Sequence, residues 1–166
     1  KESEVSVLKI LRIDNRRCIG CMACALACKQ LKSHRGLELI YVQEVSKGEW
    51  APTVCMHCQQ APCAAVCPAE AIIKLPDGVV KRADESRCIA CRNCYLVCPF
   101  GVPKIDDQSK LMVKCDLCPD RRAKGLLPYC AAICPTGAIR YEESVETSIE
   151  RKIETAQRLL RAKPLT

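Results

Sequence analysis

The sequence predicts an α+β protein of two small nested lobes with short antiparallel strands and a C-terminal helix. Three observations support this prediction. Sixteen of the 166 residues are cysteines in four tight groups of four, short β-prone segments with turn residues flank these groups, and a helical apolar pattern follows the last group. Because the chain has one Phe, one Trp and four Tyr, we expect bound metal to replace much of an ordinary apolar core.

The spacing of the cysteines indicates iron–sulfur clusters. The first and third groups have the C-x2-C-x2-C-x3-C spacing of bacterial ferredoxins, in which four thiolates hold each [4Fe–4S] cluster. The second and fourth groups each widen one gap. The sequence therefore predicts four [4Fe–4S] clusters. The groups are Cys18, Cys21, Cys24 and Cys28; Cys55, Cys58, Cys63 and Cys67; Cys88, Cys91, Cys94 and Cys98; and Cys115, Cys118, Cys130 and Cys134.

Disulfides and zinc are the alternative uses of these cysteines. The first twelve residues show no secretory signal pattern, which argues against a disulfide scaffold. Zinc ribbons place two C-x2-C pairs around a spacer and do not add a third and fourth cysteine at this spacing. A zinc-stapled module that binds nucleic acid through its basic residues stays as an alternative function, which belongs to a different class of protein from iron–sulfur proteins.

The positive formal charge is offset once clusters are counted. The 26 Lys and Arg exceed the 19 Asp and Glu, which gives +7. An oxidised cubane with four thiolates carries about −2, so four clusters bring the protein to about −1. We therefore expect no nucleic-acid partner. Basic residues beside the groups then compensate cluster charge: Lys29, Arg92, Lys104, Lys114, Arg121 and Arg122.

The strands between and around the cysteine groups predict how the groups pair. Residues 68–87 form a complete ferredoxin junction, with a strand, a Pro-Asp-Gly turn and a returning strand. The same junction is cut open at the ends, where residues 7–14 precede the first group and residues 135–141 follow the last. We therefore expect an inserted ferredoxin-like lobe, 55–103, within an outer lobe of 1–54 and 104–141.

This nesting predicts the ligands of each cluster. In two-cluster ferredoxins the fourth cysteine of each run ligates the neighbouring cluster. If the groups paired sequentially instead, Cys28 would exchange with Cys67 and Cys98 with Cys134. The predicted sets are Cys18, Cys21, Cys24 and Cys134; Cys28, Cys115, Cys118 and Cys130; Cys55, Cys58, Cys63 and Cys98; and Cys67, Cys88, Cys91 and Cys94.

Three further segments have predictable structure. Residues 37–45 are β-prone and form a strand that covers one lobe or docks a partner. Residues 102–105 and 111–113 flank a turn and predict a hairpin. Residues 142–166 contain an amphipathic helix that ends before Pro164 and packs on a partner, on a second copy or on its own chain.

The sequence contains no catalytic constellation and one histidine near the metal ligands. No nucleophile with a base, phosphate-binding glycine loop, or flavin or nicotinamide motif is present, so we expect no catalysis within this chain. His57 lies between Cys55 and Cys58. It either donates a hydrogen bond to a cluster sulfur, which would raise the reduction potential, or is only partly exposed.

The combined motifs resemble a known family. Residues 55–68 and 115–137 are similar to the second and fourth cysteine motifs of the four-cluster, ferredoxin-like electron-transfer subunits of the dimethyl sulfoxide reductase family. The resemblance implies a non-catalytic subunit with four complete cubanes, since Cys91 is present where some relatives lack a cysteine. It also implies a wire that runs from the Cys18 cluster through the Cys115 cluster to the Cys55 and Cys88 clusters.

The resemblance further implies redox partners. We expect a tungsten or molybdenum pterin catalytic subunit, such as an aldehyde or formate oxidoreductase, and a second donor or acceptor protein, for which a flavoprotein is one candidate. A freely diffusing polyferredoxin that serves a hydrogenase or carbon monoxide dehydrogenase is the alternative. No twin-arginine leader or apolar tail is present, so we expect a cytoplasmic protein without a membrane span.

Overall fold

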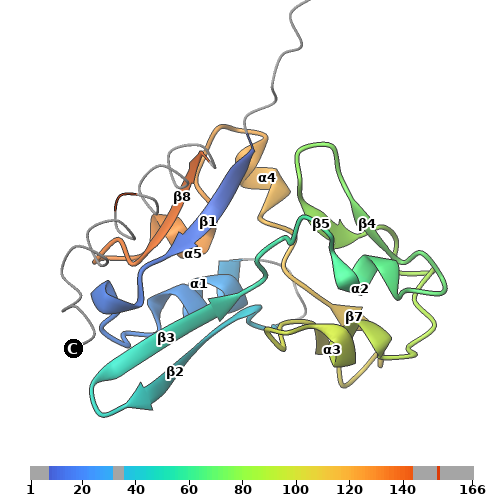
Figure 1. Cartoon of the computed structure of the whole chain (residues 1–166), viewed down its shortest axis with the longest axis horizontal. Helices are drawn as coiled ribbons and strands as arrows, with labels where there is room; N and C mark the ends of the chain where they lie inside the picture. Colours follow the sequence, from blue (N-terminus) through green and yellow to red (C-terminus); the bar gives the residue numbers. More distant parts are fainter. Residues whose placement is uncertain (1–7, 32–35, 144–152, 154–166) are drawn as a thin grey trace, which may run out of the picture.

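Short antiparallel strand pairs and short helices make up this computed structural model, which describes residues 8–31, 36–143 and 153 (Figure 1). The predicted α+β class is confirmed in these ranges. The strands are β1 (Lys9–Ile13), β2 (Ile40–Ser46), β3 (Glu49–Val54), β4 (Ile72–Lys74), β5 (Val80–Arg82), β6 (Lys104–Ile105), β7 (Met112–Val113) and β8 (Ile139–Glu143). The helices are α1 (Ala23–Leu31), α2 (Pro62–Ala65), α3 (Asn93–Val97), α4 (Pro119–Arg122) and α5 (Tyr129–Ala132).

Strands β1 and β8 bring distant parts of the chain together. They pair antiparallel with Lys9 opposite Glu143 and Ile13 opposite Ile139, and α1 packs against α5 beside them. The Arg12 guanidinium lies 3.4 Å from the Glu142 carboxylate across this pair. The sequence predicted that the segment before the first cysteine group pairs with the segment after the last group, and this pairing is present.

Strands β4 and β5 form the hairpin predicted between the second and third cysteine groups. Leu75 and Val79 close the turn, with the Leu75 N–H donating to the Val79 carbonyl at 2.8 Å. Gly78 has a φ of +79°, a conformation that glycine adopts without steric cost. Helices α2 and α3 pack together beside this hairpin, on the right of Figure 1.

The remaining strands form two further hairpins. The predicted hairpin of 102–105 and 111–113 is present as β6 and β7. The predicted strand at 37–45 is present as β2, but it begins at Ile40 and pairs with a second strand, β3, that the sequence did not predict. Pro52 lies within β3. Because proline cannot donate a hydrogen bond to a neighbouring strand, a segment that contains it is not predicted as a strand from the sequence.

The apolar core is divided into two clusters that include cysteines. One contains Ile40, Val54 and Leu117, each 1–2% exposed, with Cys24 and Cys130 among them. The other contains Ile72, Val80 and Met112 together with Cys94. The buried residues of both clusters are therefore aliphatic side chains, Met112 and cysteines.

The C-terminal segment is only partly described. Glu142 and Glu143, at the start of the predicted helical segment 142–166, are the last residues of β8. Residues 144–152 and 154–166 lie outside the described residues, and most of the predicted helix falls there. Within the described ranges, no helix has the length and hydropathy needed to cross a membrane.

Candidate functional site

All sixteen cysteines line four pockets, with four cysteines around each. Every cysteine is a free thiol. We name each pocket by one of its cysteines: the Cys18, Cys28, Cys55 and Cys88 pockets. Their sets are Cys18, Cys21, Cys24 and Cys134; Cys28, Cys115, Cys118 and Cys130; Cys55, Cys58, Cys63 and Cys98; and Cys67, Cys88, Cys91 and Cys94. These are the same four sets that the nested pairing of groups predicted.

The hairpin of β2 and β3 forms a wall of two pockets. Val42 and Pro52 line the Cys18 pocket, and Ile40 and Val54 line the Cys28 pocket. The covering strand, one of the two interpretations of the 37–45 segment, is therefore present in the structure. Apolar walls of this kind lower the local dielectric and limit the access of water to whatever the cysteines hold.

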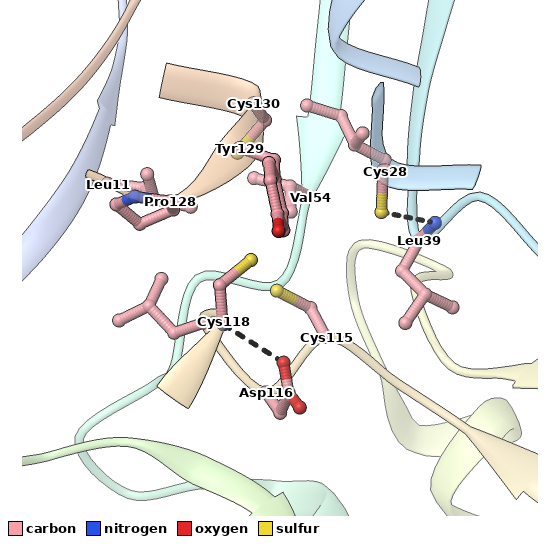
Figure 2. Close-up of a pocket in the computed structure, with 12 residues that line it drawn as sticks. Leu11, Cys28, Leu39, Val54, Cys115, Asp116, Cys118, Pro128, Tyr129 and Cys130 are labelled. Carbon is pink, nitrogen blue, oxygen red and sulfur yellow. Dashed lines mark hydrogen bonds between the residues drawn. The ribbon is translucent and has the colours of Figure 1, made fainter. Parts of the chain in front are cut away.

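Figure 2 shows the Cys28 pocket, which α1, α5 and the 115–118 loop surround. The sulfur atoms of Cys115 and Cys118 point into the same space. The Asp116 carboxylate holds their loop, because it accepts the Cys118 N–H at 3.0 Å. Across the pocket, the Leu39 N–H donates to the Cys28 Sγ at 3.3 Å.

The fourth cysteines of three groups have hydrogen-bonding partners near their sulfur atoms. Besides Cys28, the Cys67 Sγ accepts the Ala71 N–H at 3.2 Å. The Cys134 Sγ lies 3.8 Å from the hydroxyl oxygen of Thr136. Hydrogen bonds to a thiolate stabilise its negative charge, so these contacts favour the ligating form of the cysteine.

The first C-x2-C turn of each cysteine group has a left-handed residue before its second cysteine. These residues have φ values between +46° and +70°, and one of the four is a glycine: Gly20, His57, Ala90 and Leu117. Left-handed residues next to right-handed ones turn successive N–H groups toward one concave side, which is how many iron–sulfur sites bind negative charge. Sequence reasoning missed this feature, since three of the four residues give no glycine signal.

Burial keeps several thiols protonated until a metal replaces the proton. It raises the pKa of Cys24 and Cys94 to about 11 and that of Cys130 to about 12. For Cys134, burial also acts to raise the pKa, but hydrogen bonds from backbone N–H groups and from Thr136 outweigh it and lower the pKa overall. Metal ligation needs the thiolate, so loading of these pockets releases protons.

His57 is held at the side of the Cys55 pocket by backbone contact. Its Nδ1 accepts the Val80 N–H at 3.1 Å, which leaves the proton of the neutral ring on Nε2. Burial, together with the charge of Lys114, lowers the pKa of His57 to about 3. Nε2 is buried and has no hydrogen-bond partner among the described residues, but His57 is not among the residues that line the Cys55 pocket.

The donor set and the spacing of the cysteines fit iron–sulfur clusters. Four thiolates suit either zinc or an iron–sulfur cluster. Two of the groups have the C-x2-C-x2-C-x3-C spacing of bacterial ferredoxins, whereas zinc ribbons use two C-x2-C pairs around a spacer. The cysteines around the pockets therefore favour a cluster over a single zinc ion.

Comparison with known proteins identifies the family. Residues 46–144 match the 4Fe-4S dicluster domain family. The chain is 37% identical over 149 residues to the thiosulfate reductase electron transfer subunit PhsB of Salmonella typhi, with 83% of this chain and 77% of that protein covered. It is 36% identical over 145 residues to the B subunit of the anaerobic dimethyl sulfoxide reductase of Escherichia coli, with 78% and 70% covered.

A third relative comes from a dehydrogenase. The chain is 34% identical over 168 residues to the formate dehydrogenase-O iron-sulfur subunit of Escherichia coli, with 85% of this chain and 56% of that protein covered. Residues 46–144 contain the second, third and fourth cysteine groups, which contribute twelve of the sixteen cysteines that line the four pockets. The chain therefore belongs to the family of dimethyl sulfoxide reductase-type iron–sulfur subunits, which bind [4Fe–4S] clusters in a 4Fe-4S dicluster domain.

Proposed function

We propose that this chain is an electron-transfer subunit with four [4Fe–4S] clusters, which links a molybdenum or tungsten pterin catalytic subunit to a second redox protein. The observation that supports this most directly is the presence of four pockets with four cysteines each. The bound clusters supply one-electron redox chemistry. The chain itself holds them, orients them and shields them from water, and the substrate chemistry belongs to the partner.

The ligand sets of the proposal are the four pocket sets. The crossing of Cys28, Cys67, Cys98 and Cys134 to the neighbouring cluster is supported by the walls of the pockets, since each of these cysteines lines a pocket with three cysteines of another group. The β1–β8 and β4–β5 pairings support two nested ferredoxin-like lobes, with 55–103 inserted between 1–54 and 104–141.

Electrostatic effects between cysteines of different pockets support an order for the wire. Burial is the main cause that raises the pKa of Cys130, and Cys24 of the Cys18 pocket raises it further. Burial likewise raises the pKa of Cys115, and Cys55 adds to this. Burial raises the pKa of Cys94, and Cys63 adds a smaller effect. The two cysteines of each pair belong to different pockets, so the pairs support the order Cys18, Cys28, Cys55 and Cys88.

The two ends of this order are its accessible points. Among the sixteen described cysteines, Cys21 of the Cys18 pocket and Cys91 of the Cys88 pocket are exposed. Each lies two residues after a large exposed apolar side chain, Ile19 at 62% and Ile89 at 65%. We propose that the catalytic subunit and the second redox protein dock at these two ends, because a partner that covers them would bury apolar surface and approach a cluster.

Metal analysis and ligand variants test the clusters. Anaerobically purified protein is expected to contain about 16 iron and equal sulfide per chain. About four zinc without sulfide would refute the proposal and favour the zinc module. The crossing is tested with Cys98→Ser, which should alter the electron paramagnetic resonance signal of the cluster that Cys58→Ser also alters. If Cys98→Ser instead alters the signal of the cluster that Cys91→Ser alters, the ligand sets are contradicted.

Purification from the native cell tests the partners. A tagged chain should bring down a catalytic subunit in a stoichiometric complex that contains molybdenum or tungsten, and an aldehyde or formate oxidoreductase is the partner we favour. A chain that purifies alone under anaerobic conditions would contradict this. Deletion of residues 144–166 tests self-association and docking by that segment, since an unchanged subunit composition of the complex would exclude both.

A further inference from the structure

Lys114 differs from the other basic residues near the cysteine groups. Its side chain is buried, with 4% of the residue exposed, directly before Cys115. Its ammonium donates to two backbone carbonyls, that of Val80 and that of Cys115, the latter at 3.1 Å. By contrast, the Lys104 ammonium lies 2.6 Å from the Glu38 carboxylate, and the Arg122 guanidinium pairs with a carboxylate as well.

The position of Lys114 is the junction of two pockets. The side chain itself lines the Cys55 pocket. The next residue, Cys115, lines the Cys28 pocket and lies near Cys55. The ammonium is therefore buried at the point where the second and third pockets of the proposed wire approach each other.

A buried ammonium needs a compensating negative charge. Carbonyl dipoles orient it but carry no net charge, and an uncompensated buried charge is strongly disfavoured. A [4Fe–4S] cluster with four thiolates carries about −2 when oxidised, and one more negative charge when reduced. The group held by Cys55, Cys58, Cys63 and Cys98 would supply the charge that Lys114 needs.

On the basis of the proposed function, we propose that Lys114 is a charge-tuning residue for the cluster of the Cys55 pocket. Its fixed positive charge favours the reduced, more negative state and so raises the reduction potential of this cluster. An electron that arrives from the Cys28 pocket is thereby stabilised at the junction between the two lobes. One electron leaves the cluster of the Cys28 pocket and enters the cluster of the Cys55 pocket, and Lys114 transfers no proton in this step.

Redox titration of variants tests this role. Lys114→Met removes the charge at similar volume, Lys114→Arg keeps the charge, and Lys74→Met is the matched control. Lys74 also donates to a carbonyl beside this pocket, that of Gln59 at 2.6 Å, but it is exposed. The signal of the Cys55 cluster is assigned by its change in Cys58→Ser. Potentials are then followed by electron paramagnetic resonance during anaerobic titration.

We expect Lys114→Met to lower the potential of that cluster by at least about 59 mV, which is a tenfold change in a one-electron equilibrium. Lys114→Arg and Lys74→Met should stay close to the unmodified protein. If Lys114→Met loses this cluster while Lys114→Arg retains it, the need for the charge is also supported. Loss of the cluster in both variants would show that shape and hydrogen bonding matter instead, and would overturn the inference.

Unchanged potentials in Lys114→Met with full iron content would also overturn it. This failure is distinguishable from failure of the proposed function. An unmodified protein with about 16 iron per chain keeps the four-cluster proposal in place even if Lys114 has no effect. A protein without that iron would remove the four-cluster proposal itself.

Discussion

Substitution of Gly20 by alanine should destabilise one cluster site selectively. Gly20 lies in the turn between Cys18 and Cys21, with a φ of +70°. A Cβ built at this position would lie 2.4 Å from two atoms of the Trp50 indole ring, which is closer than real Cβ contacts. The added methyl group must therefore displace either the indole on β3 or the turn that presents two of the cysteines.

Gly48 provides the matched control, because it has a φ of +79° and a methyl group added there would meet no atom within 4 Å. In both variants the left-handed backbone costs about 1 kcal/mol for a residue other than glycine. At Gly20 the overpacking against Trp50 adds about 1–3 kcal/mol. We therefore expect a total of about 2–4 kcal/mol for Gly20→Ala and about 1 kcal/mol for Gly48→Ala.

Iron release is the appropriate assay. Both variants and the unmodified protein are incubated anaerobically with a chelator, and bleaching of the cluster absorbance is followed. At 1.4 kcal/mol per factor of ten, the extra cost at Gly20 corresponds to about a 5- to 150-fold greater tendency to lose that cluster. Gly20→Ala should release about four of about 16 iron atoms first. Equal release from Gly20→Ala and Gly48→Ala would refute the role assigned to the Trp50 contact.

The proposed ligand sets, one ion pair and the bound metal give four more predictions. Cys67→Ser should alter the signal of the cluster that Cys88 ligates and leave the other three, as measured by electron paramagnetic resonance; a change confined to any other cluster would contradict the crossing. Arg122→Met should cost about 1–2 kcal/mol of unfolding free energy, since it breaks a 2.8 Å pair with Asp77 and a 3.0 Å bond to the Leu117 carbonyl. Asp77→Asn should cost less than about 1 kcal/mol because only the half-exposed pair is weakened, and denaturation midpoints rank the two. Complete removal of iron should abolish the far-ultraviolet dichroism of the strand pairs, whereas an apoprotein with native dichroism would show that the core folds without metal.

The grouping of the cysteines was predictable because the spacing of ligands is local information. The ferredoxin spacing predicts the four groups, and the strands and the turn that flank the groups predict which of them meet. The pairing of β1 with β8 followed from the same reasoning, since the strand before Cys18 and the strand after Cys134 complete a junction that is intact around Pro76. Long-range topology was accessible here because the chain repeats one short motif.

The features that the sequence did not reveal depend on the tertiary environment. β3 was not predicted because it contains Pro52. A strand tolerates proline only at a position where no backbone N–H donor is needed, and the sequence does not show where that is. The left-handed conformation of Ala90 and Leu117 has no signal in residue type and is imposed by the surrounding turn. A lysine is ordinarily solvent-exposed, so the burial of Lys114 became visible only with its neighbours in place.

Cysteines that line the pockets also belong to the apolar core. Cys24 and Cys130 belong to one apolar cluster of side chains and Cys94 to the other, so iron–sulfur clusters held by these cysteines would lie against the core. A small apolar core alone provides little stability, and bound metal is one of the ways in which such folds are held together. Substitution of one of these cysteines would therefore weaken the fold and the proposed electron path together. For this reason a loss of activity cannot by itself assign a role to a residue. A changed reduction potential of a single cluster, measured in protein with its full iron content, can assign one.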